Sequence, residues 1–317
     1  MKALIVDQYG PPSSARLGEI DTPNVKDGQV LVQMHAAAVN PFDDKLITGA
    51  VKDFVPISFP YVPGMDGAGV IAEVGNGVDK WQKGDAVFGI FSHAGTLAEF
   101  VSGSADDKRL ARKPDGLDFA HAAAIPEAGL TAMTMVRAAE VRAGQQVFVI
   151  GASGGIGLFA TQLSKARGAR VIATGKESDA EYLRGLGVDE VIDYASGDPI
   201  ARVRERYPDG VDVVLDVINT QEHLLPVATT IRSGGTLVSS LFGPDQNAFP
   251  TGVTVKYIQM DPHSGDLEEL GQRAASGSMR VEISKSYPFS QASQALVDLQ
   301  DSSRHTRGKL VVSITGD

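Results

Sequence analysis

The 317-residue sequence contains no cysteine. This absence excludes disulfide bonds, thiolate catalysis and every zinc site that is built on sulfur ligands. Long apolar runs are also missing, since none approaches the ~20 residues that a membrane-spanning helix needs. The first apolar run is too short for a signal peptide and is typical of a first β-strand, so we expect a cytoplasmic protein without a membrane segment.

Basic residues are in the minority. The chain has 29 Lys and Arg against 39 Asp and Glu, which gives a formal net charge of −10. Such a charge repels phosphate backbones and anionic lipid surfaces, so neither nucleic acid nor a membrane is expected as a partner. Hydrophobic residues make up 43% of the chain, and its length suffices for one large or two ordinary domains.

The chain has three stretches of different texture. Residues 1–122 show short alternating apolar runs separated by turn residues, which is typical of antiparallel strands. In residues 123–258, continuous apolar runs alternate with helix-length segments, as in a parallel sheet buried on both faces. Residues 259–317 are mixed again and are expected to complete the first domain. We therefore predict an α/β fold with a β-rich domain and a doubly wound parallel-sheet domain.

A glycine-rich turn joins an apolar run to an amphipathic segment in the second domain. It consists of Ala152, Ser153, Gly154, Gly155, Ile156 and Gly157. These residues fit a dinucleotide fingerprint in which alanine replaces the first glycine. Gly154 would let the backbone approach a pyrophosphate, and Gly157 would let the helix pack closely on the strand. A purely structural turn is the alternative, but the strand–turn–helix context favours a dinucleotide site.

The end of the next apolar run bears on the choice of cofactor. Sites that prefer NAD carry an acidic residue about 20 positions after the glycines, where it binds the ribose. This chain has Thr174, Gly175 and Lys176 there. A cation in place of a carboxylate favours the 2′-phosphate of NADP(H). In the alternative, Glu177 or Asp179 reaches the ribose and Lys176 is solvated.

Several short motifs, taken in their order and spacing, resemble the zinc-independent quinone oxidoreductases and enone reductases of the medium-chain dehydrogenase/reductase superfamily. They span nearly the whole chain and include AAAVNPFDDKLITG (36–49), PYVPGMDGAGVIAEVG (60–75), GASGGIG (151–157) and RGKLVV (307–312). The resemblance implies a GroES-like catalytic domain, 1–122 completed by 259–317, and a Rossmann domain, 123–258. It also implies a homodimer.

The resemblance further implies that no catalytic metal is bound. Zinc-dependent relatives carry a cysteine where Asn40 stands, a His-Glu pair where Met65 and Asp66 stand, and a cysteine near Glu127. An amide, a thioether and one carboxylate do not make a zinc site.

By similarity, further residues are expected at the cofactor. Thr131 would lie beside the nicotinamide, Tyr194 near the adenosine ribose or its phosphate, and Leu241 and Phe242 on the nicotinamide side. Lys309 would also approach the cofactor. Three of them have an alternative role: Tyr194 as an ordinary strand-end tyrosine, Phe242 as a core residue and Lys309 as an exposed strand lysine.

The expected reaction is the NADPH-dependent reduction of a quinone or of the activated C=C of an α,β-unsaturated carbonyl. Hydride would move to an electron-poor carbon, and donors must then stabilise the enolate. Asn40 could donate from its amide, Lys45 could stabilise the enolate or relay a proton, and Asp43 could orient Lys45 or fix the loop. All three could instead serve as turn and helix cap. His93 and Tyr61 could line the pocket.

Two other functions are compatible with the same fold. An enoyl-thioester reductase would be favoured by a basic entrance for the substrate phosphates, and no such cluster is visible in the sequence. A non-catalytic NADPH-sensing or RNA-binding protein is the other, and the acidic balance disfavours RNA.

Overall fold

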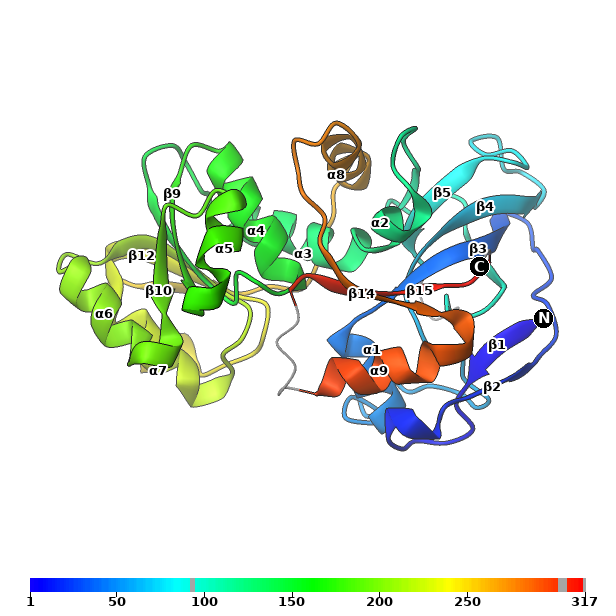
Figure 1. The fold of residues 1–317 in the computed structure, drawn as a ribbon, viewed down its shortest axis with the longest axis horizontal. Helices are drawn as coiled ribbons and strands as arrows, with labels where there is room; N and C mark the ends of the chain where they lie inside the picture. Colours follow the sequence, from blue (N-terminus) through cyan, green and yellow to red (C-terminus); the bar gives the residue numbers. More distant parts are fainter. Residues whose placement is uncertain (92–94, 302–306, 316–317) are drawn as a thin grey trace. The chain divides into compact units, whose positions relative to one another are not determined.

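The computed structural model describes residues 1–91, 95–301 and 307–315. The chain forms two compact units, Met1–Glu127 with His263–Asp317 and Ala128–Pro262 (Figure 1). Both chain ends therefore belong to the first unit. Within the described ranges, none of the helices has the length and apolar character that crossing a membrane requires.

The first unit is built on a mostly antiparallel sheet (Figure 1). The strand order among the described residues is β14-β15-β3-β4-β5-β7, and β6 also pairs with β3. Strands β14 and β15 run parallel, whereas β3 is antiparallel to β15, β4 and β6. The strands are β1 (Lys2–Ile5), β2 (Arg16–Glu19), β3 (Gln29–Val39), β4 (Asp66–Val74), β5 (Ala86–Ile90), β6 (Phe100–Ser104), β7 (Leu110–Arg112), β14 (Ile283–Pro288) and β15 (Lys309–Ser313). The helices are α1 (Pro41–Thr48), α2 (Phe119–Ala123), α8 (Asp266–Ala275) and α9 (Ala292–Gln300).

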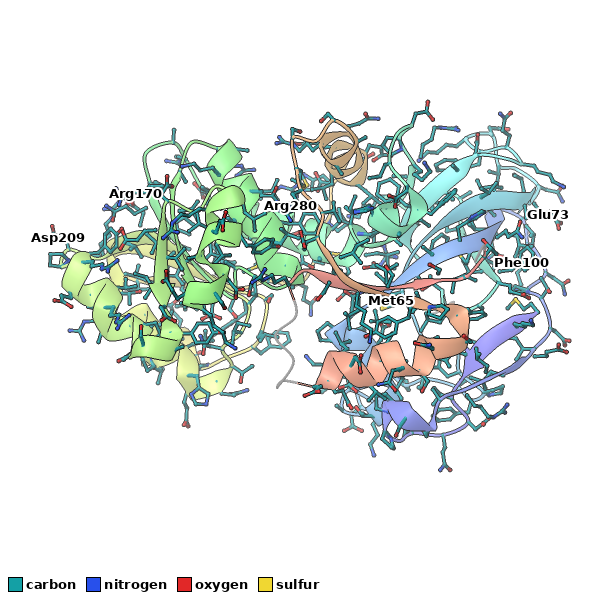
Figure 2. All side chains as sticks on the ribbon, viewed as in Figure 1. Met65, Glu73, Phe100, Arg170, Asp209 and Arg280 are labelled. Atoms are coloured by element: carbon teal, nitrogen blue, oxygen red, sulfur yellow. The ribbon has the colours of Figure 1, made fainter. Side chains whose placement is uncertain are left out.

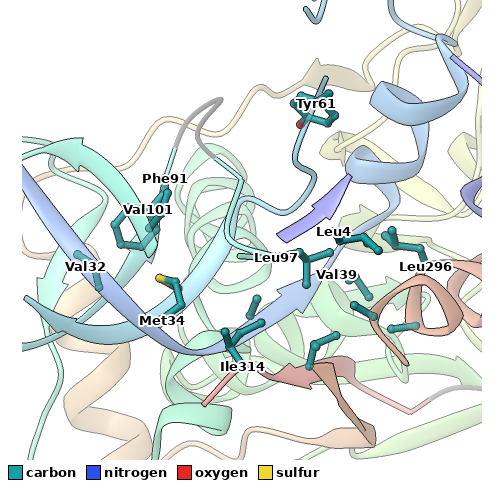
Figure 3. Close-up of a cluster of buried hydrophobic side chains, with 14 of the residues drawn as sticks. Leu4, Val32, Met34, Val39, Tyr61, Phe91, Leu97, Val101, Leu296 and Ile314 are labelled. Atoms are coloured by element: carbon teal, nitrogen blue, oxygen red, sulfur yellow. The ribbon is translucent and has the colours of Figure 1, made fainter. Parts of the chain in front are cut away.

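The core of the first unit lies against β3 (Figure 3). Val32 and Met34 of β3 are fully buried and belong to one cluster with Leu97, Val101 and Leu296. Burying one such side chain stabilises the fold by about 1.5–3 kcal/mol. Apolar contacts thus fix the central strand along most of its length, and they thereby also fix the position of the residue after its end, Asn40.

The pairing of β3 with β15 determines which residues meet beyond the end of β3. Leu310 pairs with Val39 in an antiparallel ladder, so Lys309 lies opposite Asn40, the first residue after β3. Asp66, the first residue of β4, pairs with Ala38 of β3. The sheet therefore brings Asn40, Asp66 and Lys309 to one place, although 269 positions separate Asn40 from Lys309.

The second unit is a parallel sheet covered by helices. In the described part of the chain it has six strands in the order β10-β9-β8-β11-β12-β13, and all neighbours are parallel. Side chains of α6 and α7 pack into a core cluster on one face of the sheet, and α4 and α5 lie on the other (Figure 1). The strands are β8 (Gln146–Ile150), β9 (Arg170–Gly175), β10 (Glu190–Asp193), β11 (Val211–Asp216), β12 (Ile231–Ser239) and β13 (Thr254–Tyr257). The helices are α3 (Pro126–Ala138), of which Pro126 and Glu127 belong to the first unit, α4 (Gly155–Ala166), α5 (Ala180–Gly185), α6 (Pro199–Arg206) and α7 (Leu224–Ala228). The predicted α/β fold class is confirmed.

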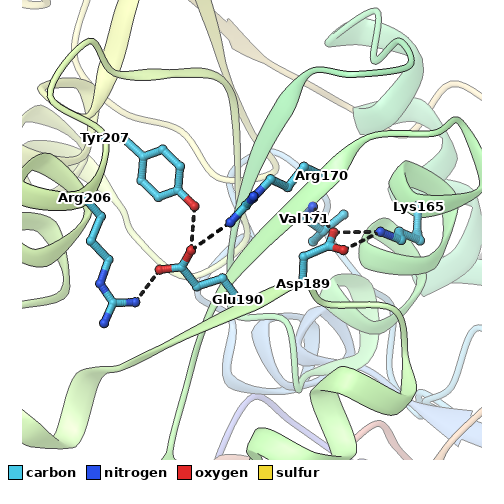
Figure 4. A network of polar contacts seen from close by, with 7 residues as sticks. All are labelled: Lys165, Arg170, Val171, Asp189, Glu190, Arg206 and Tyr207. Carbon is cyan, nitrogen blue, oxygen red and sulfur yellow. Dashed lines mark hydrogen bonds and ion pairs between the residues drawn. The ribbon is translucent and has the colours of Figure 1, made fainter.

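A network of charged side chains ties the edge strand β10 to its neighbours (Figure 4). The Glu190 carboxylate accepts hydrogen bonds from Arg206 and, at 2.6 Å, from the hydroxyl of Tyr207. Next to it, Lys165 of α4 pairs with Asp189 at 2.6 Å. Pairs as exposed as Lys165–Asp189 contribute only about 0–1 kcal/mol each.

Candidate active site

Helix α1 starts directly after the central strand. Pro41 occupies the first helical turn, and the carboxylate Oδ2 of Asp43 accepts a hydrogen bond from the backbone N–H of Asn40 at 2.8 Å. This bond confirms the helix-cap role for Asp43 that the turn motif predicts. Lys45 lies on the same helix and is partly exposed, and the described residues show no hydrogen bond between it and Asp43.

Polar side chains meet next to this helix start, deep in the first unit. The Nδ2 of Asn40 donates to Oδ2 of Asp66 at 2.9 Å, and the ammonium group of Lys309 donates to Oδ1 of Asn40. Lys309 Nζ also lies 3.6 Å from Asp66 Oδ2. The backbone N–H of Glu127 donates to the other oxygen of Asp66 at 3.0 Å. We call Asn40, Asp43, Asp66, Glu127 and Lys309 the polar cluster.

Burial decides the charge state of the polar cluster. Asp43, Asp66 and Lys309 are at most 5% exposed. Burial raises the pKa of Asp43 to about 7, although the Asn40 backbone N–H opposes the rise. Burial, and after it the negative charge of Asp66, raises the pKa of Glu127 to about 8. Burial also raises the pKa of Asp66, against the Lys309 ammonium and the Asn40 amide. At neutral pH Glu127 is therefore mostly protonated.

The Glu127 carboxyl group differs from the other acids of the cluster in its contacts. Its Oε2 atom is buried and has no hydrogen-bond partner among the described residues, while the side chain as a whole is partly exposed. Lys45 and Lys309 both act on it electrostatically. The sequence analysis did not select Glu127 as a reacting group. The signal was available, because "AAAIPEAGLTAM" places one acid in an otherwise apolar stretch.

The glycine turn of the second unit has the steric features that the fingerprint predicts. A Cβ on Gly157 would lie 2.1 Å from the carbonyl oxygen of Gly151, so only glycine lets α4 pack this closely. A Cβ on Gly154 would meet nothing nearer than that same oxygen at 3.5 Å. The protein itself therefore does not require glycine at position 154, and the open space suits the approach of a ligand.

Helix α4 begins at Gly155, so its first N–H groups point out of the turn. Ala152 is buried, whereas Ser153 and Ile156 are partly exposed. These side chains flank a helix N-terminus of the kind that binds phosphate groups.

The residues at the end of β9 are those expected to distinguish NADP(H) from NAD(H). Thr174 is buried, and its hydroxyl accepts a hydrogen bond from Gly151 N–H at 3.3 Å, which ties the glycine turn to β9. Lys176 comes directly after the strand and is partly exposed. Asp179 is fully buried and Glu177 is exposed, so Glu177 is the acid of this pair with access to a ribose.

The remaining predicted cofactor residues differ in exposure. Tyr194 comes directly after β10 and is 41% exposed, and Phe242 is 65% exposed. Thr131 is buried on α3, and Leu241 donates its backbone N–H to the Ser239 hydroxyl at 3.0 Å. The core role considered for Phe242 is therefore wrong.

Two further alternatives can be compared with the structure. The exposed-lysine role considered for Lys309 is wrong, because the antiparallel pairing places its side chain against Asn40. Its approach to the cofactor stays a prediction. Tyr61 is buried, and burial, then the nearby Asp43 charge, raises its pKa. His93 lies outside the described residues.

Comparison with known proteins gives two family matches and a set of similar proteins. A family profile described as alcohol dehydrogenase GroES-like domain matches residues 26–139, and one described as zinc-binding dehydrogenase matches residues 186–312. A quinone oxidoreductase of Sus scrofa is 30% identical over 98% of this chain and 97% of its own length. An NADPH-dependent alkenal/one oxidoreductase of Arabidopsis thaliana is 34% identical over 98% of this chain and 79% of its own length. The solved structure of the quinone oxidoreductase from Coxiella burnetii has a TM-score of 0.88 at 29% identity and covers 99% of both chains.

A GroES-like sheet unit and a parallel-sheet unit with a glycine-rich strand-to-helix turn define a medium-chain dehydrogenase/reductase. The matches are more specific, and the chain belongs to the quinone oxidoreductase branch of that superfamily. It is an oxidoreductase that uses a nicotinamide cofactor.

Proposed function

We propose that the protein is an NADPH-dependent reductase that transfers hydride to a quinone or to the activated C=C of an α,β-unsaturated carbonyl, without zinc. The names of two relatives, quinone oxidoreductase and NADPH-dependent alkenal/one oxidoreductase, support this choice of substrates. The observation that carries the proposal is the position of the Lys309 ammonium group in the polar cluster.

The polar cluster does not fit a zinc ion, despite the description of the matching profile. Asn40 and Asp66 stand where zinc-dependent relatives have ligands, and here they bind Lys309. A divalent ion at this place would meet a positive charge and an amide oxygen that is already occupied. Met65, which directly precedes Asp66, offers only a thioether (Figure 2). Among the described residues, no three His, Cys, Asp or Glu side chains are grouped so that they could hold a metal.

A side-chain cation buried in this way favours reduction of a conjugated system over alcohol oxidation. Zinc-dependent alcohol oxidation uses a Lewis acid that lowers the pKa of the hydroxyl. Conjugate reduction requires close placement of the two reactants and stabilisation of the enolate oxygen. The bound nicotinamide supplies the hydride. Lys45, partly exposed on α1, is the cation we assign to the enolate, and Asn40 has one amide N–H that Asp66 does not occupy.

The second unit supports NADPH as the hydride donor. Lys176 directly follows the last residue of β9, Gly175, so the strand ends in a cation and not in a carboxylate. The space at Gly154 is open for a pyrophosphate. A Lys176→Ala variant is expected to raise the Michaelis constant for NADPH about tenfold, since a charge-assisted hydrogen bond is lost. The constant for NADH should stay within about twofold in that variant.

The test is a spectrophotometric panel of quinones, enones and enals with NADPH and NADH, with and without a chelator. We expect fast NADPH oxidation that the chelator leaves unchanged. Higher rates with crotonyl-CoA than with any simple quinone or enone would identify an enoyl-thioester reductase instead. No turnover with any acceptor, together with salt-resistant RNA binding in a gel-shift assay, would support the non-catalytic alternative. Equal Michaelis constants for both cofactors would refute the role of Lys176.

The proposal includes a homodimer, as the resemblance implies. Strand β13 is an edge of the six-stranded sheet in the described part of the chain and could pair with a second copy. Sedimentation velocity would measure the oligomeric state, and a monomer at micromolar concentration would contradict this part.

A further inference from the structure

Two glutamates of the first unit share an unusual feature. The Oε2 atoms of Glu127 and Glu268 are both buried without a hydrogen-bond partner in the described part of the structure, although each side chain is partly exposed. A buried carboxylate oxygen without a donor is unfavourable, whereas a protonated carboxyl group tolerates the same position. The surroundings distinguish the two residues, because only Glu127 lies next to other ionisable groups of the polar cluster.

The groups that face Glu127 come from three elements. Asp66 at the start of β4 and Asp43 on α1 contribute carboxyl groups, whereas Lys309 on β15 and Lys45 on α1 contribute ammonium groups. The Lys309 ammonium lies 3.6 Å from Asp66 Oδ2, and the Asn40 amide donates to the same oxygen. Lys309 acts on Glu127 as well and lowers the pKa of its carboxyl group, but burial and the Asp66 charge raise that pKa by more.

Glu127 also stands at the start of a helix that leads to a predicted cofactor residue. It is in the first turn of α3, and Thr131 comes four positions later on the same helix. Residues at this spacing lie on one side of a helix, one turn apart. Glu127 and Thr131, the residue expected beside the nicotinamide, therefore occupy neighbouring turns on one side of α3.

We propose that Glu127 is the proton donor of the reduction and that its burial beside Asp66 keeps the carboxyl group protonated between turnovers. This inference rests on the proposed function. Hydride transfer breaks the C4–H bond of the nicotinamide and forms a C–H bond at the β-carbon of the substrate, which leaves an enolate. The O–H bond of Glu127 then breaks, a C–H bond forms at the α-carbon, and the carboxylate regains a proton from water. One NADPH and one proton are consumed for each carbonyl product.

The experiment compares the wild type with Glu127→Gln, Glu127→Asp and Glu268→Gln. The substrate is an enone with an α-methyl group, 2-methylcyclopent-2-enone, so that protonation creates a stereocentre. Glutamine keeps the size of the side chain but carries no transferable acid proton. Glu268→Gln is the matched control, because it removes a carboxyl group with the same buried oxygen elsewhere in the unit.

We expect Glu127→Gln to lower kcat about 100-fold at pH 7, the size of a general-acid contribution, with a Michaelis constant for NADPH within about twofold. The wild-type kcat should fall as the pH rises through about 8, because the proton on Glu127 is then lost. This decline should be absent in Glu127→Gln. Product formed by the variant should also lose stereochemical preference at the α-carbon, because water protonates either face. Glu127→Asp should recover part of the rate, the pH decline and the stereochemical preference.

The outcomes separate this inference from the proposed function. If the wild type fails to oxidise NADPH with every acceptor in the panel, the proposed function is overturned. An active wild type together with a Glu127→Gln variant that matches Glu268→Gln in rate, pH profile and stereochemistry overturns the role of Glu127 alone. If Glu127→Gln does not fold, the Glu127→Asp variant tests the role instead. A Glu127→Asp variant with the wild-type rate but without the decline of kcat at high pH would contradict the role of Glu127 as proton donor.

Discussion

Replacing Lys309 by methionine is expected to destabilise the first unit strongly. Methionine has a similar length and no branch, so the variant removes the charge with little change in packing volume. Asp66 is 0% exposed and would keep only the Asn40 amide and the Glu127 backbone N–H as partners. Removing one partner of a buried ion pair costs about 3–5 kcal/mol. For a unit of this size, each kcal/mol lowers the melting temperature by about 2–4 °C.

The loss should depend on pH in a defined direction. Burial already raises the pKa of Asp66, and without the Lys309 ammonium the pKa rises further. A carboxyl group whose pKa is higher in the folded than in the unfolded state lowers the free energy of unfolding once the pH exceeds the unfolded-state pKa of about 4. This loss grows with pH until the pH passes the folded-state pKa. The stability difference between wild type and Lys309→Met should therefore be small at pH 4.5 and largest at pH 8.

Urea unfolding at these two pH values measures the effect. The double variant Asp66→Asn with Lys309→Met should regain most of the stability at pH 8, because no buried charge is left unpaired. Lys165→Met is the control for loss of an exposed pair and should change stability by at most about 1 kcal/mol. If Lys309→Met unfolds like Lys165→Met at pH 8, the buried pair does not have this energetic role.

Two further predictions concern the glycine turn and Asp43. Gly157→Ala should lower the melting temperature, because its Cβ would be 2.1 Å from Gly151 O. Gly154→Ala should have the wild-type melting temperature but bind NADPH at least tenfold more weakly in calorimetry. Normal NADPH binding by Gly154→Ala would refute the pyrophosphate role. Because the folded pKa of Asp43 is raised to about 7, wild-type stability should fall between pH 4 and 7 through this group. In Asp43→Asn, which can still accept the Asn40 hydrogen bond, the unfolding free energy should decline less over that range, and an identical decline would contradict the assignment.

The parallel-sheet unit was readable from the sequence because its strands are continuous apolar runs. The apolar runs at 147–150, 170–174 and 190–193 lie within residues 123–258 and form strands β8, β9 and β10 of the structure. Strand β14, Ile283–Pro288, has a different sequence pattern. Ser284, Lys285 and Ser286 are exposed there, so the strand lacks the apolar pattern that sequence analysis depends on. Its pairing with β15 holds it in the sheet.

The polar cluster could not be predicted in the same way. Asn40 was selected as an amide donor and Lys309 as a cofactor lysine, each from a short motif. Their contact depends on the antiparallel register of β3 and β15, which local sequence does not encode. A slip of one residue would turn Lys309 to the other face of the sheet. The pKa of Glu127 was equally hidden, since it results from burial and from Asp66, 61 positions earlier in the chain.

The ammonium group in the polar cluster belongs to a side chain, Lys309, and is therefore positioned by the backbone. Its position is set by the ladder between β3 and β15, in which Leu310 pairs with Val39. Substitutions that disturb this ladder should therefore alter the charge of Asp66, and through it the protonation of Glu127, without touching either acid. A Leu310→Pro variant would remove a ladder hydrogen bond while leaving both carboxyl groups in the chain. The charge balance of the polar cluster thus depends on the register of the sheet.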